Sequence, residues 1–168
     1  MTAPRTPRSG TPALTLMRQL GIRHSIHEYE HDKSAKDFGA EAVRALGFDA
    51  SAVLKTLIWE TDGQPCAVVI PVAAKVSAKK LAAALGAKRA SIATTATAER
   101  LSGSVVGAIS PLGLRRGIPT VVDISSLGQP QVYVSAGRRG LELGLAPEDL
   151  IATTQAIVAE VTESALAT

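Results

Sequence analysis

The sequence predicts one α/β (α+β) domain with a mixed, mainly antiparallel sheet and flanking helices. Helix-like and strand-like segments alternate irregularly along the 168 residues, whereas a doubly wound parallel sheet needs a regular alternation. Two apolar runs are joined by Asp62-Gly63, the strongest short signal for a hairpin between antiparallel strands. No internal repeat or linker divides residues 11–168, and this length suits a single core.

The first half of the chain carries clear start and stop signals. Thr11 is a typical helix N-cap, Pro12 suits the first helical turn, and Gly21 suits the helix end. Period-two alternation follows in "IRHSIHEYE", and Gly47 closes a second, short helix. The predicted elements are, in order, a helix over residues 12–20, a strand over 22–30, a helix over 40–46, and strands over 53–60 and 66–72.

The second half is predicted to alternate in the same irregular way. Ser77 is expected to cap the helix "AKKLAAAL", which stops at Gly86. The segment "VVGAISPLG" (105–113) is apolar but interrupted by glycine and proline, so we expect a strand end that runs into a structured loop. Acidic residues directly after Pro147 favour a helix start there. The remaining predicted elements are a helix from residue 95 or 96 to 101, strands over 118–124, 131–136 and 141–145, and a last strand over 156–161.

Composition indicates a globular protein of a reducing compartment. Hydrophobic residues make up 46% and aromatic residues 3%, so the core must be built from Ala, Val, Leu and Ile. The single cysteine, Cys66, excludes an internal disulfide. The longest apolar run, "CAVVIPVAA", is too short to span a bilayer, and "MTAPRTPRSG" lacks the apolar region of a secretory signal. We therefore expect a cytoplasmic protein without membrane segments, in which residues 1–10 form a short disordered tail.

The charge does not suit a protein that coats long nucleic acids. The net charge is +3, and without Arg5 and Arg8 of the tail 16 basic residues face 15 acidic ones, which leaves +1. The basic residues nevertheless occur in doublets, which serve either solubility or a local patch that faces phosphates. These doublets are Lys79-Lys80, Lys88-Arg89, Arg115-Arg116 and Arg138-Arg139.

Common nucleophile and metal motifs do not occur in the sequence. His24 and His27 point to opposite faces of a predicted strand, and His31 does not complete a ligand spacing, so no metal site is expected. Cys66 opens an apolar strand with no basic neighbour, which favours a buried, inert thiol over a nucleophile. The sequence contains no GxSxG, Walker A or dinucleotide-binding pattern, so no cofactor is expected either.

Lys55 is the residue that the strand prediction leaves unexplained. In "SAVLKTLIWE" it falls on the same face as Val53, Leu57 and Trp59, which is the more apolar of the two faces. An ammonium group there is costly unless it is paired or faces a cleft. From the residues alone, Lys55 either faces a pocket or extends its aliphatic stem along Leu57 and Trp59 at a strand edge.

Two loops combine small residues with the ability to bind a ligand. The segment "GAISP" (107–111) could present backbone N–H and C=O groups to a ligand that approaches closely, or it could be an ordinary strand-to-turn junction. The segment "SAGRRG" (135–140) could bring Arg138 and Arg139 to a phosphate, or it could form a plain hairpin turn. Composition alone leaves both alternatives open for each loop.

Six segments together carry a family resemblance. They are "YEHD" (29–32), "LKTL" (54–57), "PVAAKVSAKKLAAALGAK" (71–88), "VGAISPLG" (106–113), "PTVVD" (119–123) and "VYVSAGRRGLEL" (132–143). In this order they resemble the YbaK family, the free-standing relatives of the editing domain inserted in bacterial prolyl-tRNA synthetase. The resemblance extends over residues 11–160 without large gaps, and its specificity lies in the ordered set rather than in any one motif.

The resemblance implies an aminoacyl-tRNA deacylase site on a single α/β domain with a barrel-like sheet. The indispensable lysine of the family corresponds to Lys55, and the threonine that follows it corresponds to Thr56. The GxxxP loop, which holds the 3′ end of tRNA, runs here from Gly107 to Pro111. That loop is often written with two glycines, and the second is Ala108 in this chain. The remaining implied binding positions are Tyr29, Ile109, Ser110, Ser135, Arg138, Arg139 and Glu142, the last of which is often Asp in close relatives.

The implied function is trans-editing, the removal of cysteine mischarged on tRNA(Pro). A proline pocket cannot strongly reject the smaller cysteine, because one missing methylene discriminates by only about 1–3 kcal/mol. The cysteinyl thiol could attack its own ester carbonyl, so the enzyme would need no nucleophile of its own. Two alternatives stay open: a deacylase for Ala-tRNA(Pro) or other small aminoacyl-tRNAs that uses a positioned water, and a non-catalytic tRNA- or synthetase-binding module. The expected partners are aminoacyl-tRNA and prolyl-tRNA synthetase.

Overall fold

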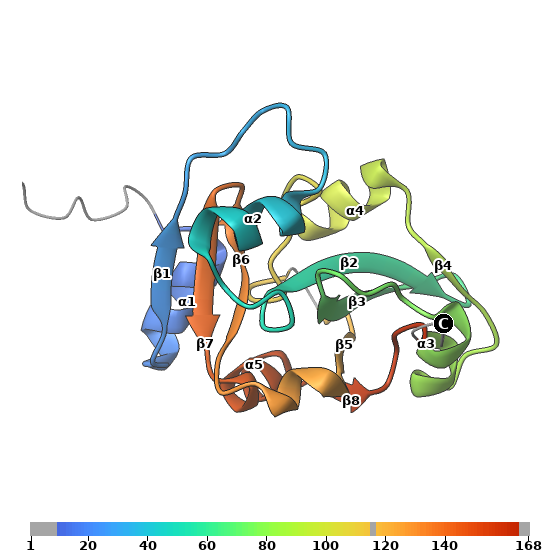
Figure 1. Ribbon diagram of the computed structural model, residues 1–168. Coiled ribbons are helices and arrows are strands. Elements are labelled where there is room, and N and C mark those ends of the chain that lie inside the picture. Colours follow the sequence, from blue (N-terminus) through green and yellow to red (C-terminus); the bar gives the residue numbers. More distant parts are fainter. Residues whose placement is uncertain (1–9, 115–116, 165–168) are drawn as a thin grey trace, which may run out of the picture.

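The computed structural model describes residues 10–114 and 117–164. The predicted tail, apart from Gly10, and the doublet Arg115-Arg116 lie outside the described residues. None of the helices within these ranges combines the length and apolar character needed to cross a membrane. The elements in chain order (Figure 1) are α1 (Pro12–Leu20), β1 (Ser25–Glu28), α2 (Phe38–Leu46), β2 (Leu54–Thr61), β3 (Gln64–Pro71), α3 (Ala78–Ala84), β4 (Ala90–Ile92), α4 (Thr95–Ser102), β5 (Thr120–Asp123), the short 3-10 helix η1 (Ile124–Gly128), β6 (Val132–Arg138), β7 (Leu141–Leu145), α5 (Pro147–Thr154) and β8 (Ile157–Ala159).

The strands form two sheets rather than one closed barrel (Figure 1). The smaller sheet has the order β1-β7-β6 and is entirely antiparallel. The larger sheet has the order β4-β2-β3-β5-β8; β2 runs antiparallel to β3 and β4, while β3, β5 and β8 are parallel to one another. An isolated bridge between Val53 and Tyr133 links the two sheets. The predicted fold class, a mixed and mainly antiparallel α/β domain, is therefore confirmed, and "barrel-like" describes the two linked sheets only loosely.

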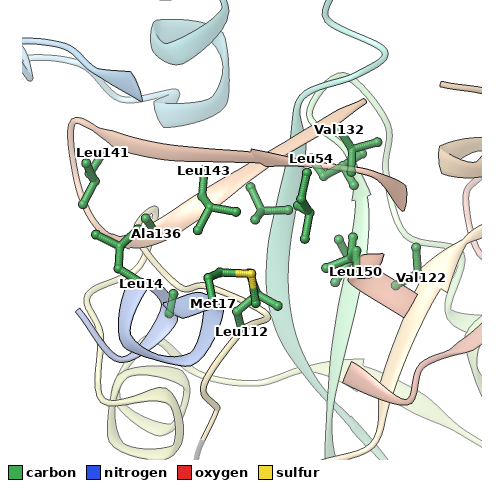
Figure 2. Close-up of a cluster of buried hydrophobic side chains, with 14 residues drawn as sticks. Leu14, Met17, Leu54, Leu112, Val122, Val132, Ala136, Leu141, Leu143 and Leu150 are labelled. Carbon is green, nitrogen blue, oxygen red and sulfur yellow. The ribbon is translucent and has the colours of Figure 1, made fainter. Parts of the chain in front are cut away.

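The main core lies where the two sheets meet α1 and α5 (Figure 2). Its members are aliphatic side chains that are almost fully buried, as the low aromatic content predicts. The larger sheet contributes Leu54, Val69 and Val122; the smaller sheet contributes Val132, Val134, Ala136, Leu141, Leu143 and Leu145; and the helices contribute Ala13, Leu14, Met17 and Leu150. This core fixes β2 beside β6, which pairs with β7, and the candidate site lies near these strands.

Local signals in the sequence placed most element ends correctly. The side-chain oxygens of Thr11 and Ser77 accept hydrogen bonds from backbone N–H groups in the first turns of α1 and α3, as an N-cap requires. Gly21 ends α1 in the left-handed region, with a φ of 64°. Asp62 and Gly63 have φ values of 47° and 80°, which are the positive values that a tight two-residue hairpin demands.

Two expectations about the elements were wrong. Residues 105–113 contain no strand, because Gly107 and Gly113 take left-handed conformations with φ values of 89° and 78° that break an extended run. The strand predicted over residues 22–30 is limited to Ser25–Glu28. On β2, Leu54, Thr56 and Ile58 are buried, whereas Lys55, Leu57 and Trp59 on the more apolar face are only partly buried. β4 and η1 were not predicted from the sequence, and both are short and largely exposed.

Candidate functional site

A pocket of about 410 Å³ lies along the edge of β2, against the start of α2 and the segments around α4. β4 pairs only with residues 59–61 of β2, so among the described residues the preceding part of β2 has no strand partner on that edge. Side chains from both faces of the strand reach the pocket there. Lys55 and Leu57 come from one face, and Thr56 and Ile58 come from the other.

Six of the twelve predicted site residues line this pocket, and the fold brings them together from four segments. They are Lys55 and Thr56 on β2, Gly107 and Ile109 in the loop after α4, Ser135 on β6 and Glu142 on β7. The other six lie outside the pocket wall: Tyr29, Ala108, Ser110, Pro111, Arg138 and Arg139.

Lys55 is a half-buried cation in the pocket wall. Loss of solvent lowers the pKa of its ammonium group, the nearby carboxylate of Asp37 opposes this effect, and the charge of Lys75 adds to it. Lys55 makes no ion pair with any carboxylate in the described part of the chain. An unpaired ammonium group at a pocket is free to meet a phosphate or a developing oxyanion of a substrate.

Glu142 and Thr56 supply polar groups to the buried part of the pocket. Glu142 is 7% exposed, and burial raises the pKa of its carboxyl group from 4.5 to about 8. At neutral pH this carboxyl group is therefore mostly protonated and can donate a hydrogen bond, but it is a poor general base. The hydroxyl of Thr56 is buried without a hydrogen-bond partner among the described residues. Both groups are available to a polar ligand.

The raised pKa of Glu142 predicts a measurable dependence of stability on pH. Between about pH 4.5 and 8 the folded protein keeps this proton while the unfolded chain releases it, so the free energy of unfolding falls as the pH rises through that window. One pKa unit corresponds to about 1.4 kcal/mol, so the shift from 4.5 to about 8 predicts a loss of roughly 4–5 kcal/mol across this window, which Glu142→Gln abolishes. Urea unfolding of both proteins at pH 5, 7 and 9 measures it. If the free energy of unfolding changes with pH in the same way for both proteins, the raised pKa does not belong to Glu142.

The loop from Gly107 to Pro111 is held in place by its neighbours on two sides. The hydroxyl of Ser135 donates a hydrogen bond of 2.9 Å to the carbonyl oxygen of Ala108, which ties the loop to β6. Gly107 has a φ of 89°, and a Cβ atom there would lie 2.2 Å from Cδ2 of Phe38. Ala108, Ser110 and Pro111 are buried, so they support the loop, whereas Gly107 is exposed. Only glycine suits this position, because both the conformation and the space exclude a side chain.

The remaining predicted residues make internal contacts around the pocket. The guanidinium group of Arg139 lies 4.3 Å from the centre of the Phe38 ring and donates a 2.8 Å hydrogen bond to the carbonyl oxygen of Val106. Arg138 forms an exposed ion pair with Glu28 at 3.3 Å. Burial and the nearby carboxyl groups of Glu142 and Glu41 raise the pKa of Tyr29 to about 12, so Tyr29 stays a neutral phenol.

Several pocket residues were missed by the sequence analysis. Asp37 caps α2 by accepting a 3.0 Å hydrogen bond from the N–H of Ala40, and Phe38 follows it at the pocket. An Asp after a polar loop and directly before the helix was the signal that could have identified the cap. The other missed lining residues include a cation, Lys36, and a hydroxyl, Thr95. The rest are apolar or glycine and carry no chemical signal of their own: Gly39, Ala42, Val53, Leu54, Leu57, Ile58, Val72, Ile92, Ala93, Ala98 and Val106.

The histidines and the cysteine lie away from the pocket wall. His27 packs edge-on against Phe48 and Tyr133, and His31 contacts the carboxylate of Glu41 at 2.9 Å. Cys66 is fully buried, and burial raises the pKa of its thiol to about 11. Among the described residues, the pocket is therefore lined by Lys36 and Lys55, the carboxyl groups of Asp37 and Glu142, hydroxyls and a tight backbone loop, but by neither an imidazole nor a thiol.

Comparison with known proteins gives this arrangement a family. The model of the family described as "Aminoacyl-tRNA editing domain" matches residues 32–153 of this chain. EbsC of Enterococcus faecalis, provisionally named a Cys-tRNA(Pro)/Cys-tRNA(Cys) deacylase, is 31% identical over 154 residues, which cover 90% of this chain and 93% of EbsC. The proline–tRNA ligase of Geobacter metallireducens is 31% identical over 101 residues, which cover 60% of this chain but 17% of the ligase.

Solved structures share the fold over almost the whole chain. The crystal structure of hypothetical protein APE2540 superposes with a TM-score of 0.82 at 28% identity and covers 91% of this chain and 100% of that one. A crystal structure described provisionally as a trans-editing enzyme for prolyl-tRNA synthetase has a TM-score of 0.80 at 21% identity and covers 91% and 96%. With the family match over more than half of its length and the pocket described above, this chain belongs to the aminoacyl-tRNA editing domain family.

Proposed function

We propose that this protein is a trans-editing deacylase that removes cysteine from Cys-tRNA(Pro) with the help of the substrate thiol. The sulfur forms a bond to the ester carbonyl carbon, and the bond from that carbon to the ribose oxygen breaks. The thiol proton ends on the released ribose hydroxyl, and cysteine leaves as a small thiolactone that water opens. This chemistry requires positioning and charge stabilisation from the protein, but no protein nucleophile.

The observation that carries the proposal is the set of groups at the pocket. It contains Lys55 and the tight Gly107 loop, whereas the one cysteine of the chain is buried elsewhere with a raised pKa and none of the three histidines reaches the pocket wall. A reaction that takes its nucleophile from the substrate suits these residues. The name of EbsC, which covers nearly the same length, supports cysteine as the amino acid.

Two parts of the pocket are suited to the charge that develops on the ester oxygen. Lys55 is an unpaired, partly desolvated cation, and such a charge stabilises an oxyanion more strongly than a fully hydrated one. The N–H groups of Gly107 and Ile109 make no hydrogen bond to any described residue, so they are available as donors, while the N–H of Ala108 is already bound to the carbonyl oxygen of Val105 at 2.9 Å.

The experiment that tests the proposal is deacylation of tRNA(Pro) charged with cysteine, alanine or serine, with prolyl-tRNA synthetase present or absent. Rapid loss of cysteine and slow loss of serine is the expected result, because a hydroxyl ionises far less than a thiol and is the weaker nucleophile. Equal rates for Cys- and Ser-tRNA(Pro), or faster loss of alanine, would show that a positioned water attacks the ester instead of the substrate thiol. If none of the three charged tRNAs is hydrolysed, the protein is a non-catalytic binding module.

Cys66→Ser is expected to leave deacylation of Cys-tRNA(Pro) within a factor of about 3 of the wild-type rate, since the residue is not needed for chemistry that uses the substrate thiol. The side chain is buried among Val68, Val121 and Leu81, so we expect a loss of stability of about 1–2 kcal/mol instead. Single-turnover rates with circular dichroism as a check on folding measure both effects. If Cys66→Ser is folded but inactive, the thiolate of Cys66 takes part in the reaction and the substrate thiol is not sufficient.

A further inference from the structure

A second, basic hollow of about 510 Å³ lies between α3 and the segment that leads into β4. Its walls consist of alanines and of three exposed cations, Lys79, Lys88 and Arg89, and no acidic residue lines it. None of the three cations forms an ion pair with a carboxylate in residues 10–114 or 117–164. In contrast, Lys80 on the same helix binds Glu160 at 2.7 Å. We call Lys79, Lys88 and Arg89, with the alanines around them, the basic groove.

The segment that carries two of these cations is held firmly. The carboxylate of Asp62 at the hairpin tip accepts hydrogen bonds of 3.0 Å from the backbone N–H groups of Lys88 and Arg89. The carboxylate of Asp62 thereby fixes the backbone, while the side chains of Lys88 and Arg89 stay exposed. Because the backbone is already fixed, only these side chains lose freedom when an anion binds, which lowers the entropy cost.

The basic groove adjoins the candidate active site through β4. Ala90 at the start of β4 lines the groove, and Ile92 at its end lines the pocket that contains Lys55. Two residues along a strand span only about 7 Å. Ile92 faces Trp59 across the pair of strands, so it lies on the same face of the sheet as Lys55, and it is 61% exposed. One ligand can therefore occupy the pocket and extend across β4 into the groove.

We propose that the basic groove binds the phosphate backbone of the acceptor arm of the tRNA whose aminoacyl end lies in the pocket. A nucleic-acid strand carries about one negative charge per 3.4 Å of helix axis, so a continuation of the substrate chain brings several phosphates to three unpaired cations. Alanine walls let the sugar–phosphate backbone approach closely. The groove contacts phosphates rather than bases, so it sets affinity and orientation but does not choose the amino acid.

The sequence had indicated Arg138 and Arg139 as phosphate contacts. In the structure Arg138 is paired with Glu28 and Arg139 is packed on Phe38, so these two side chains already have partners. The doublet Lys88-Arg89, together with Lys79, offers unpaired cations next to the pocket. The inference rests on the proposed function only in taking an aminoacyl-tRNA as the substrate, and it holds for any amino acid.

The test compares two variants that each lose three positive charges. One is Lys79→Gln, Lys88→Gln and Arg89→Gln; the control is Arg18→Gln, Arg23→Gln and Arg44→Gln, which are exposed and lie on or near α1 and α2, away from α3 and β4 (Figure 1). Fluorescence anisotropy with uncharged tRNA(Pro) measures affinity at several salt concentrations. We expect the groove variant to bind about tenfold more weakly than the control at 0.1 M salt, with a salt slope smaller by about 2–3.

A kinetic arm uses substrates with and without the acceptor arm. The groove variant should need about tenfold more enzyme for half-maximal single-turnover deacylation of charged tRNA, with an unchanged maximal rate, and should cleave the cysteinyl ester of a CCA trinucleotide like the wild type. Equal tRNA affinity of the groove variant and the control would overturn the inference.

If the wild type deacylates no charged tRNA, the proposed function fails, and the anisotropy data still show whether the basic groove binds tRNA. If the triple variant does not fold, Lys79→Gln and Lys88→Gln alone should each lower the slope by about 1.

Discussion

Lys55→Ala is expected to lower single-turnover deacylation of Cys-tRNA(Pro) by a factor on the order of 10²–10³ while the fold stays intact. The ammonium group lies at the pocket without an ion pair to any described carboxylate, so its charge is available to the reacting ester, and its partial loss of solvent strengthens that interaction. Removing one preorganised group that stabilises an oxyanion typically costs this much in rate. Stability should be unchanged or higher, because a partly buried charge without a partner is removed.

The matched control for this experiment is Lys75→Ala. Lys75 is close enough for its charge to lower the pKa of Lys55, but it is exposed and does not line the pocket. Its replacement should leave the rate within a factor of about 3, since exposed charges act weakly through water. Thermal unfolding by circular dichroism shows whether each variant is folded. Turnover of folded Lys55→Ala at the wild-type rate would remove this residue from the active site.

Gly107→Val is expected to lower the same rate by a factor on the order of 10² or more. Its φ of 89° is unfavourable for a β-branched residue, and the added side chain would overlap the ring of Phe38, which a Cβ atom alone would approach to 2.2 Å. The loop must shift to relieve the overlap, and a displacement of about 1 Å near the reacting atoms is enough for such a loss. Rates are measured at saturating enzyme so that weaker binding does not obscure the chemical step.

Three further variants separate the overlap from the backbone conformation. Gly47 also has a positive φ, of 68°, but a Cβ atom there would contact nothing within 4 Å, so Gly47→Ala reports the conformational cost alone. Gly107→Ala should lower the free energy of unfolding more than Gly47→Ala does. Combining Gly107→Ala with Phe38→Ala should reduce the cost of Gly107→Ala, because the overlapping ring is then absent. A double-mutant cycle measures this coupling. Full activity of Gly107→Val would show that the loop is only a turn.

The agreement between sequence and structure is best where the cause is local. N-caps at Thr11 and Ser77 act within one helical turn, and Asp62-Gly63 determines a hairpin through the conformations of two residues. Such features depend on neighbours in the chain, so a single sequence predicts them. The strand expected within residues 105–113 failed because apolar composition does not distinguish a strand from a buried loop when glycines take positive φ values.

The sequence by itself determined the composition of the core, the helix caps, the hairpin and, through the family resemblance, Lys55 and the Gly107 loop as the residues to examine. Only the tertiary structure decided which residues share the pocket. Asp37 and Phe38 reach it from α2, and Glu142 reaches it from β7, because the two sheets pack against each other and β4 leaves part of the β2 edge open. The protonation of Glu142 and the partly desolvated charge of Lys55 follow from burial, which is a property of packed elements far apart in sequence and not of any local pattern.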